Sequence, residues 1–235
     1  AEGKARLVAG NTRWPIFGSA TFIAPMTEVD TYQLLDGRRA SSAIRDQIKI
    51  GSALVAKYRG RPPHLAAVLV GDDGPSQTYV ASKVKACEMV GFKSTLIRKP
   101  ASITELELLE LIALMNIDAE LDGFIVQLPL PKHINEERIT LAIDPSKDVD
   151  GFHPQNLGRM MLGLPGFLPA TPNGIVELLK FHGIPTEGRH CVVVGRSNIV
   201  GTPISILMSR NASPGNCTVT LTHSRTKDLP SITRQ

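Results

Sequence analysis

The chain has 235 residues, of which 42% are apolar and 20% are charged, with a net charge of +4 and a pI near 9.1. This composition is typical of a globular protein, and no window approaches the roughly 18 uninterrupted apolar residues that a membrane helix needs. Interspersed basic and acidic residues argue against nucleic-acid binding, and three cysteines without a CxxC pair argue against a disulfide framework or a metal site and favour a reducing cytoplasm.

The first 25 residues lack apolar periodicity and mix Gly, Pro, Arg and Trp. We expect residues 1–25 to be a disordered extension outside the fold, with Met26 as the natural start. A tag or a weak transit segment stays open, and a transit segment would place the protein in an organellar matrix.

From Tyr32 onward, helical and strand patterns alternate. The predicted elements are an amphipathic helix within Tyr32–Tyr58, a buried strand at His64–Gly71, a helix at Ser76–Val90, a strand at Ser94–Arg98, a helix at Ile103–Asn116, a strand at Gly123–Leu128 and a helix at Asn135–Ile143. This order predicts a three-layer α/β domain over residues 26–150. In a parallel sheet, ligands bind beyond the carboxyl ends of the strands, so we expect chemistry in the loops after Val70 and Val126.

Residues 151–172 are rich in Gly, Pro and Met and are predicted to be an interdomain segment. A second domain over residues 173–235 is indicated by a helix with Thr171 as its N-cap and Pro172 in its first position. The pattern continues with a buried strand at Arg189–Gly195, a helix from about Pro203 and a strand at Cys217–Thr222. The insertion-like stretch 210–216 is expected to lengthen a surface loop.

The first strand of this second domain runs into Gly195-Arg-Ser-Asn-Ile-Val-Gly-Thr-Pro, which predicts a strand, glycine turn and helix that present free amides to a phosphate. The next strand ends in His223-Ser-Arg-Thr, with no acid where an NAD site usually has one for the ribose hydroxyls. Guanidinium and hydroxyl groups instead favour a 2′-phosphate, so NADP is predicted over NAD. The residues concerned are Arg196, Ser197, Ser224 and Arg225.

A second constellation lies on the helix after the first strand, where Tyr79 and Lys83 are four residues apart and share one face, with Ser76 one turn earlier. A desolvated ammonium can act as a base near neutral pH, and a phenol ring can orient a flat substrate. Taken alone, this spacing fits an exposed helical pair better than a site.

Five ordered motifs change that balance. They are Ser76-Gln-Thr-Tyr-Val-Ala-Ser-Lys-Val-Lys-Ala-Cys, Gly123-Phe-Ile-Val-Gln-Leu-Pro-Leu-Pro, Lys147-Asp-Val-Asp-Gly-Phe-His-Pro, Pro169-Ala-Thr-Pro-Asn-Gly and the glycine turn at Gly195. With them, the chain resembles the bifunctional methylenetetrahydrofolate dehydrogenase/cyclohydrolase family from about Tyr32 to Arg225. The resemblance implies a catalytic domain, a Rossmann-like NADP-binding domain, a folate cleft between them and a homodimer.

The resemblance also implies roles. Lys83 is the expected catalytic lysine, Tyr79 orients the pterin, Gln127 bonds near Lys83, and Asp150 accepts hydrogen bonds from the pterin. Further substrate contacts are expected from Ser76, Leu128, Pro129 and Asp148. The expected cofactor contacts are Thr171, Gly195, Arg196, Ser197, Val200, Gly201, Pro203, His223, Ser224 and Arg225.

Structural alternatives stay open for several of these residues. Gln127 could cap the strand end, and Asp148 or Asp150 could serve the turn in Asp-Val-Asp-Gly. His153 is expected to pack or hydrogen-bond rather than to act as an acid or base.

The chain stops after two convincing strands of the nucleotide domain, so we expect an incomplete Rossmann-like domain with exposed apolar surface. The expected function is oxidation of methylenetetrahydrofolate with NADP, followed by hydrolysis of the methenyl product. Two alternatives remain: a non-catalytic folate-binding or dimerisation fragment, and another NADP-dependent two-domain dehydrogenase.

Overall fold

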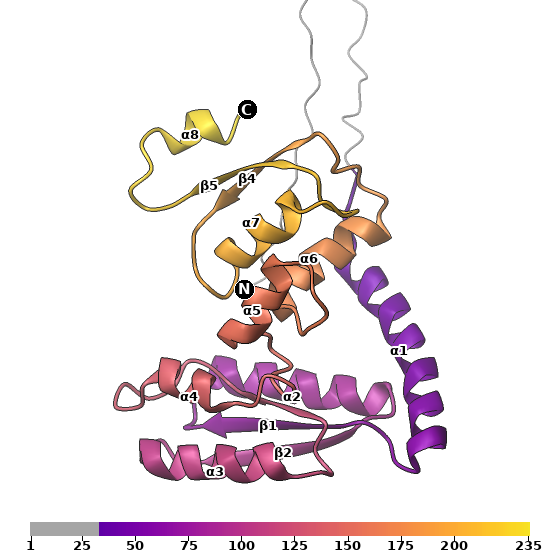
Figure 1. Cartoon of the computed structure of the whole chain (residues 1–235), viewed down its shortest axis with the longest axis vertical. Helices are drawn as coiled ribbons and strands as arrows, with labels where there is room; N and C mark the ends of the chain where they lie inside the picture. The colour runs from indigo at the N-terminus through magenta and orange to yellow at the C-terminus, as the bar shows by residue number, and fades with distance from the viewer. Residues whose placement is uncertain (1–32) are drawn as a thin grey trace, which may run out of the picture. The chain divides into compact units, whose positions relative to one another are not determined.

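Helices and strands alternate along the described part of the chain, except that three successive helices separate β3 from β4 (Figure 1). The computed structural model describes residues 33–235, so the expectations for residues 1–25 and for Met26 lie outside the described residues. The elements are α1 (Gly37–Arg59), β1 (His64–Val70), α2 (Gly74–Met89), β2 (Lys93–Lys99), α3 (Glu105–Ile117), β3 (Gly123–Val126), α4 (Glu136–Ala142), α5 (Pro154–Met161), α6 (Ala170–Phe181), β4 (His190–Val194), α7 (Gly201–Ser209), β5 (Thr218–Thr222) and α8 (Leu229–Ile232).

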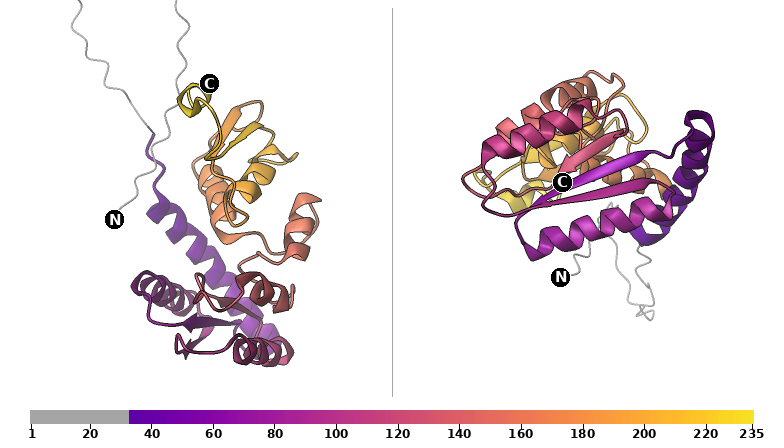
Figure 2. Two further views of the ribbon diagram at one scale, coloured as in Figure 1. Left: turned by 90° about the vertical axis from the view of Figure 1, so that its left-hand side faces the viewer. Right: turned by 90° about the horizontal axis from the view of Figure 1, so that it is seen from below.

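The first sheet has the strand order β2-β1-β3, and both pairings are parallel. Central β1 contributes side chains to both faces. Ala66, Val68 and Val70 pack with α3 and α4 on one face, while Ala67 and Leu69 pack with α2 on the other. Figure 1 and the right-hand view of Figure 2 show α2 and α3 on opposite sides of these strands. The predicted three-layer α/β domain is confirmed, and the doubly covered sheet explains the unbroken apolar run of β1.

Capping residues fix where two of the helices begin. At α2, Asp73 accepts a bond from the backbone N–H of Ser76. At α3, Thr104 and Glu107 form a capping box, in which each side chain accepts from the other's backbone N–H. The sequence predicts both helices to within two residues of their observed starts.

The second sheet pairs β4 and β5 in parallel, with Val193 opposite Leu221, and α7 connects the two strands. The predicted strands and helix are present, but the prediction that β4 is buried is wrong. Val194 is 62% exposed, and the other residues of β4 are half-buried or exposed. An apolar run in the sequence shows that a strand is able to be buried. Whether it is buried depends on the elements that pack against it. The exposed Val194, Ile199 and Leu221 agree with the expected exposed apolar surface.

The predicted interdomain segment 151–172 contains a helix that the sequence did not indicate, α5. Its N-cap is His153, whose Nδ1 accepts a hydrogen bond of 3.1 Å from the backbone N–H of Gln155. The hydrogen-bonding role expected for His153 is thereby confirmed. The Gly and Met content of the segment gave no helical pattern in the sequence. The first residue of α5 is Pro154, and the first helical position is the one where proline fits best.

The start of α6 also differs from the prediction. The N-cap position is Pro169, without a side-chain bond, and Thr171 lies inside the first turn rather than at the cap. Proline is tolerated in a first turn because the N–H groups there have no partner within the helix, so Pro172 fits two residues later than expected.

The loop over residues 210–216 is less superficial than predicted. Pro214 and Gly215 are buried, and the N–H of Gly215 donates to Oγ1 of Thr186 at 2.9 Å. The N–H of Asn216 donates to the carbonyl of Arg210 at 2.9 Å. These bonds close the loop on itself and tie it to the segment before β4.

Candidate active site

Tyr79 and Lys83 lie one turn apart on α2, and the structure confirms that they share a face. Nζ of Lys83 is 4.9 Å from the centroid of the Tyr79 ring, which is a cation–π distance. Tyr79 is 54% exposed, so its ring remains open to a flat ligand.

The ammonium of Lys83 also meets Asp150, 67 residues further along the chain, with 3.5 Å between Nζ and Oδ1. Both side chains are largely covered, at 27% and 19% exposure. Burial raises the pKa of Asp150, while the charge and hydrogen bond of Lys83 act in the opposite direction. The pair therefore places a basic and an acidic group together in a partly desolvated position, where protons can move between them and a ligand.

Asp150 belongs to a turn organised around Asp148. Asp148 is 2% exposed, and its oxygens accept from the N–H groups of Gly151 at 3.1 Å and His153 at 2.8 Å. An isolated parallel bridge to Phe124 ties the turn to β3. The turn role that the sequence left open for Asp148 is thus observed, and its contact with substrate stays a prediction.

The turn depends on a glycine at position 151. Gly151 has φ +72°, and a side-chain carbon there would lie 2.5 Å from the carbonyl carbon of Leu168. Both the left-handed backbone and the close approach require glycine.

The end of β3 supplies Gln127, Leu128 and Pro129. Nε2 of Gln127 donates to the carbonyl of Leu128 at 2.7 Å. Its Oε1 is buried and has no hydrogen-bond partner within the described residues 33–235. The expected bond between Gln127 and Lys83 stays a prediction. A buried acceptor without a partner is costly, which favours its use by a ligand.

The predicted substrate contacts differ in accessibility. Ser76 is buried, and its hydroxyl donates to Oδ2 of Asp73 at 2.7 Å, so it serves the cap of α2. Leu128 is half-buried against the main core, whereas Pro129 is exposed and follows a cis peptide bond. Their contacts with substrate stay predictions.

The glycine turn between β4 and α7 is closed by its two glycines. Gly195 has φ +112°, and a side-chain carbon at Gly201 would lie 1.9 Å from the carbonyl oxygen of Gly195. Gly201 therefore lets the start of α7 approach the end of β4, as a dinucleotide-binding turn requires.

Three amides at the helical end of this turn already have partners, which differs in part from the sequence-based expectation of free amides. Oγ of Ser197 accepts from the N–H groups of Val200 at 3.2 Å and Gly201 at 3.3 Å, and the N–H of Thr202 donates to the Ser197 carbonyl at 3.0 Å. A Ser at this position competes for the first helical amides, as an N-cap does. Arg196 is exposed beside these amides, and its contact with a phosphate stays a prediction.

The loop after β5 lies at the same edge of the second sheet as the glycine turn. The N–H of Gly195 donates to the carbonyl of Thr222 at 3.0 Å, which joins the two strand ends. Ser224 and Arg225 are exposed, and Nδ1 of His223 accepts from the N–H of Arg225 at 3.2 Å. The arrangement fits the anionic groups of a dinucleotide.

Three other predicted cofactor contacts lie in different surroundings. Thr171 is exposed, Val200 is half-buried at the N-cap position of α7, and Pro203 is buried in the first turn of α7. Their roles at a cofactor stay predictions.

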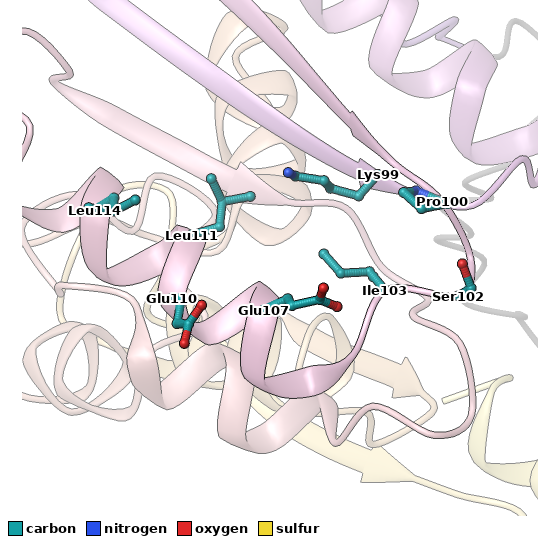
Figure 3. A pocket seen from close by; sticks show the side chains of 8 residues that line it. All are labelled: Lys99, Pro100, Ser102, Ile103, Glu107, Glu110, Leu111 and Leu114. Carbon is teal, nitrogen blue, oxygen red and sulfur yellow. The ribbon is translucent and has the colours of Figure 1, made fainter.

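A separate hollow lies where β2 ends, between the following loop and the outer side of α3 (Figure 3). Its lining mixes Lys99, Glu107 and Glu110 with apolar side chains such as Leu111 and Leu114. None of the predicted site residues lines it. A smaller pocket behind the turn includes Asp148, Asp150 and Phe152 among its lining residues.

Two negative findings concern residues 33–235 alone. Within this part of the chain, no cluster of three or more His, Cys, Asp or Glu side chains is placed to hold a metal ion. No helix in the same range has the length and apolar character needed to cross a membrane.

Comparison with known proteins decides the family. Residues 35–150 match the model described as "Tetrahydrofolate dehydrogenase/cyclohydrolase, catalytic domain", and residues 169–235 match the model of the NAD(P)-binding domain of the same family. The chain belongs to the tetrahydrofolate dehydrogenase/cyclohydrolase family. The alternative of another NADP-dependent two-domain dehydrogenase is not supported.

Relatives in this family are highly similar to the chain. The Bifunctional protein FolD of Cytophaga hutchinsonii is 60% identical over 203 residues, which cover 86% of this chain and 70% of the relative. The corresponding protein of Porphyromonas gingivalis is 57% identical over 202 residues, covering 86% and 68%.

Solved structures of the tetrahydrofolate dehydrogenase/cyclohydrolase family share the fold. The bifunctional FolD enzyme of Campylobacter jejuni has a TM-score of 0.79 and 46% identity, covering 83% of this chain and 68% of that one. The Trypanosoma brucei enzyme, complexed with NADP cofactor and inhibitor, has a TM-score of 0.77 and 33% identity, covering 85% and 66%.

The sequence reasoning missed one polar residue that the structure places beside the site. Asn156, on α5, is 3% exposed and donates to the carboxylate of Asp148. No motif or spacing singled it out, because it lies in the segment that was predicted to be an irregular connection.

Proposed function

We propose that the chain oxidises 5,10-methylenetetrahydrofolate to 5,10-methenyltetrahydrofolate with NADP, and hydrolyses this product to 10-formyltetrahydrofolate. The observation that carries the proposal is the Lys83–Asp150 pair beside the open Tyr79 ring, in a chain whose relatives are bifunctional FolD proteins. A lysine, a carboxyl group and an aromatic face supply what a pterin substrate and its hydrolysis need.

The oxidation step asks for positioning rather than for a strong acid. NADP, when bound, supplies the hydride acceptor. The chain's part is to hold the folate: Tyr79 offers its exposed ring face, and Asp150 offers a carboxylate to the amino and ring N–H groups of the pterin. Oε1 of Gln127 offers a further acceptor.

The hydrolysis step asks for a base. Water must lose a proton as it attacks the methenyl carbon, and a proton must reach a ring nitrogen as the ring opens. Lys83 is the group proposed to move these protons, with Asp150 at 3.5 Å to stabilise its charged form between transfers.

The residues of the second sheet fit NADP. Gly201 allows the close approach of α7 to the strand end, and Arg196 and Arg225 are exposed at the same sheet edge. Guanidinium groups form bidentate hydrogen bonds with phosphates, and NADP differs from NAD by its 2′-phosphate, so these residues support NADP over NAD.

The proposal is tested by assaying the two activities separately. The purified chain is mixed with methylenetetrahydrofolate and NADP, then NAD, and methenyl formation is followed by absorbance. Hydrolysis is measured from methenyltetrahydrofolate alone. We expect oxidation with NADP and hydrolysis without it, and absence of both would leave a folate-binding module instead.

Lys83→Met provides the matched variant. Methionine keeps the unbranched chain but removes the ammonium, so hydrolysis is expected to fall by about 10²- to 10⁴-fold, while NADP binding stays unchanged. Unchanged hydrolysis would remove Lys83 from the mechanism.

A cytoplasmic homodimer that binds neither nucleic acid nor membrane is part of the same proposal. It is supported by the family resemblance, the mixed surface charge and the three unpaired cysteines Cys87, Cys191 and Cys217. Sedimentation of the purified chain tests the oligomeric state, and fractionation of the source cells tests the compartment.

A further inference from the structure

Asp148, a buried carboxylate, lies two residues before Asp150, the carboxyl group of the site. Asp148 is 2% exposed, and its Oδ1 accepts from the N–H of Gly151. Its Oδ2 accepts from the N–H of His153 at 2.8 Å and from Nδ2 of Asn156 at 3.0 Å. A buried carboxylate needs such donors, because an isolated buried charge is strongly unfavourable.

Asn156 connects this carboxylate to the start of the turn. Its Nδ2 donates both to Oδ2 of Asp148 and, at 2.9 Å, to the carbonyl of Pro145. Asn156 is itself 3% exposed and lies in the first turn of α5. One amide group on a helix therefore holds two points of the turn that precedes it.

The turn restricts the backbone conformation of Asp150, which lies between Asp148 and Gly151. Asp150 is flanked by Val149 and by Gly151, whose N–H is bonded to Asp148 and whose α-carbon is packed against Leu168. The position of the Asp150 carboxylate relative to Lys83 is consequently set by the turn rather than by the long flexible lysine alone.

We infer that Asn156 is a positioning residue for the reaction, which through Asp148 holds the Asp150 carboxylate at Lys83. The inference rests on the proposed function, since it assigns the chemistry to Lys83 and Asp150. Asn156 is buried and donates to Asp148, so its part in the reaction is indirect. It acts by keeping a carboxylate within reach of the lysine, and small displacements of reacting groups cost large factors in rate.

The electrostatics of the site agree with this role. The charged groups that act on Asp150 are Lys83 from α2 and Asp148 from its own turn. Burial is the largest cause of the raised pKa of Asp150, and the charge of Asp148 adds to it. Loosening the turn admits water, so it is expected to lower the pKa of Asp150 toward its ordinary range.

The test compares Asn156→Ala with Asn116→Ala. Asn116 is a matched control, because it also holds a loop by two bonds, to the carbonyl of Ala142 and from the N–H of Asp144, without contacting Asp148. The readouts are kcat/KM for methenyltetrahydrofolate hydrolysis across pH, and the titration of the Asp150 carboxyl group by carbon NMR of the whole chain.

Asn156→Ala is expected to lower kcat/KM by about tenfold or more and to shift the Asp150 titration and the pH profile to lower pH. Asn116→Ala is expected to change thermal stability without either shift. If Asn156→Ala fails to fold, Asn156→Ser, which keeps a shorter donor, is measured in its place.

Equal pH profiles and equal Asp150 titrations in the Asn156 and Asn116 variants would overturn the inference and leave Asn156 a purely structural residue. The NMR titration does not need turnover. If the unaltered chain proves inactive, the proposed function fails, while the titration still decides whether Asn156 positions Asp150.

Discussion

The α-carbon of Gly201 faces the carbonyl oxygen of Gly195 so closely that a side-chain carbon at position 201 would lie 1.9 Å from that oxygen. Atoms at this distance overlap, so the start of α7 must move away from the end of β4 to admit any side chain. The geometry of the proposed dinucleotide turn therefore depends on this single glycine.

Gly201→Ala is expected to weaken NADP binding by more than about tenfold, because the displaced turn no longer presents Arg196 and Ser197 together. Binding is measured by titration calorimetry. Gly51→Ala in α1 is the control: no atom beyond the neighbouring residues and the backbone of its own helix lies within 4 Å of the added carbon, and the change is expected to stabilise the protein by about 0.4–1 kcal/mol. Equal NADP affinity in both variants would contradict the role of Gly201.

Arg196→Ala and Arg225→Ala are each expected to reduce the preference for NADP over NAD by about tenfold, since a charge-assisted bond to the 2′-phosphate contributes about 1.5–3 kcal/mol. The measurement is the ratio of kcat/KM values for the two cofactors. Arg189→Ala removes the same charge just before the amino end of β4, far from the carboxyl ends of the strands where Arg196 and Arg225 lie. This variant should leave the ratio unchanged. A ratio that falls equally in all three variants would indicate a general charge effect.

Burial raises the pKa of Asp150 in the folded protein, and this makes stability depend on pH. A carboxyl group with a raised pKa stabilises the fold below its unfolded pKa, and this contribution is lost as the pH rises through the folded pKa. Asp150→Asn cannot ionise. The Tm of the variant minus that of the unaltered chain is therefore expected to increase as the pH is raised from about 3 to 7. A constant difference would refute the raised pKa.

Asp122 should show the opposite trend. Its carboxylate binds the Arg61 guanidinium at 2.7 Å and the N–H of His64 at 2.8 Å, and these partners lower its pKa, the Arg61 hydrogen bond most strongly. A lowered pKa stabilises the fold above the unfolded pKa, and the gain is lost as the pH falls through the folded value.

Asp122→Asn is accordingly expected to destabilise the protein by about 1–2 kcal/mol at neutral pH, because the side chain is partly exposed and water screens the pair. The deficit should shrink as the pH is lowered through the acid range. Urea unfolding at several pH values provides the measurement, and a deficit independent of pH would count against the ion pair.

The first domain could be predicted well from sequence because two of its three strands, β1 and β3, are buried on both faces. β1 is apolar from Leu65 onward and β3 is apolar throughout, and the helices between them begin at recognisable caps such as Thr104. The second sheet was harder to predict. β4 has the same apolar appearance as β1, yet Val194 is exposed, since burial depends on what packs against a strand.

The site likewise contains features that could be predicted from the sequence and features that could not. The shared face of Tyr79 and Lys83 follows from helical spacing alone. The meeting of Lys83 with Asp150 does not, because a contact across 67 residues depends on strand order and on a turn held by buried polar groups. The capping of the glycine turn by Ser197 was equally hidden, since the same hydroxyl can accept from an amide or donate to a phosphate.

The unmatched Oε1 of Gln127 has a consequence for inhibitor design. A compound that places an N–H group against this oxygen satisfies an acceptor that the folded chain leaves without a partner in its described part. An otherwise identical compound with an ether oxygen there would set two acceptors against each other and lose about 1–3 kcal/mol of binding free energy. A hydrogen-bond donor is therefore the group that we expect an inhibitor to need at this end of β3.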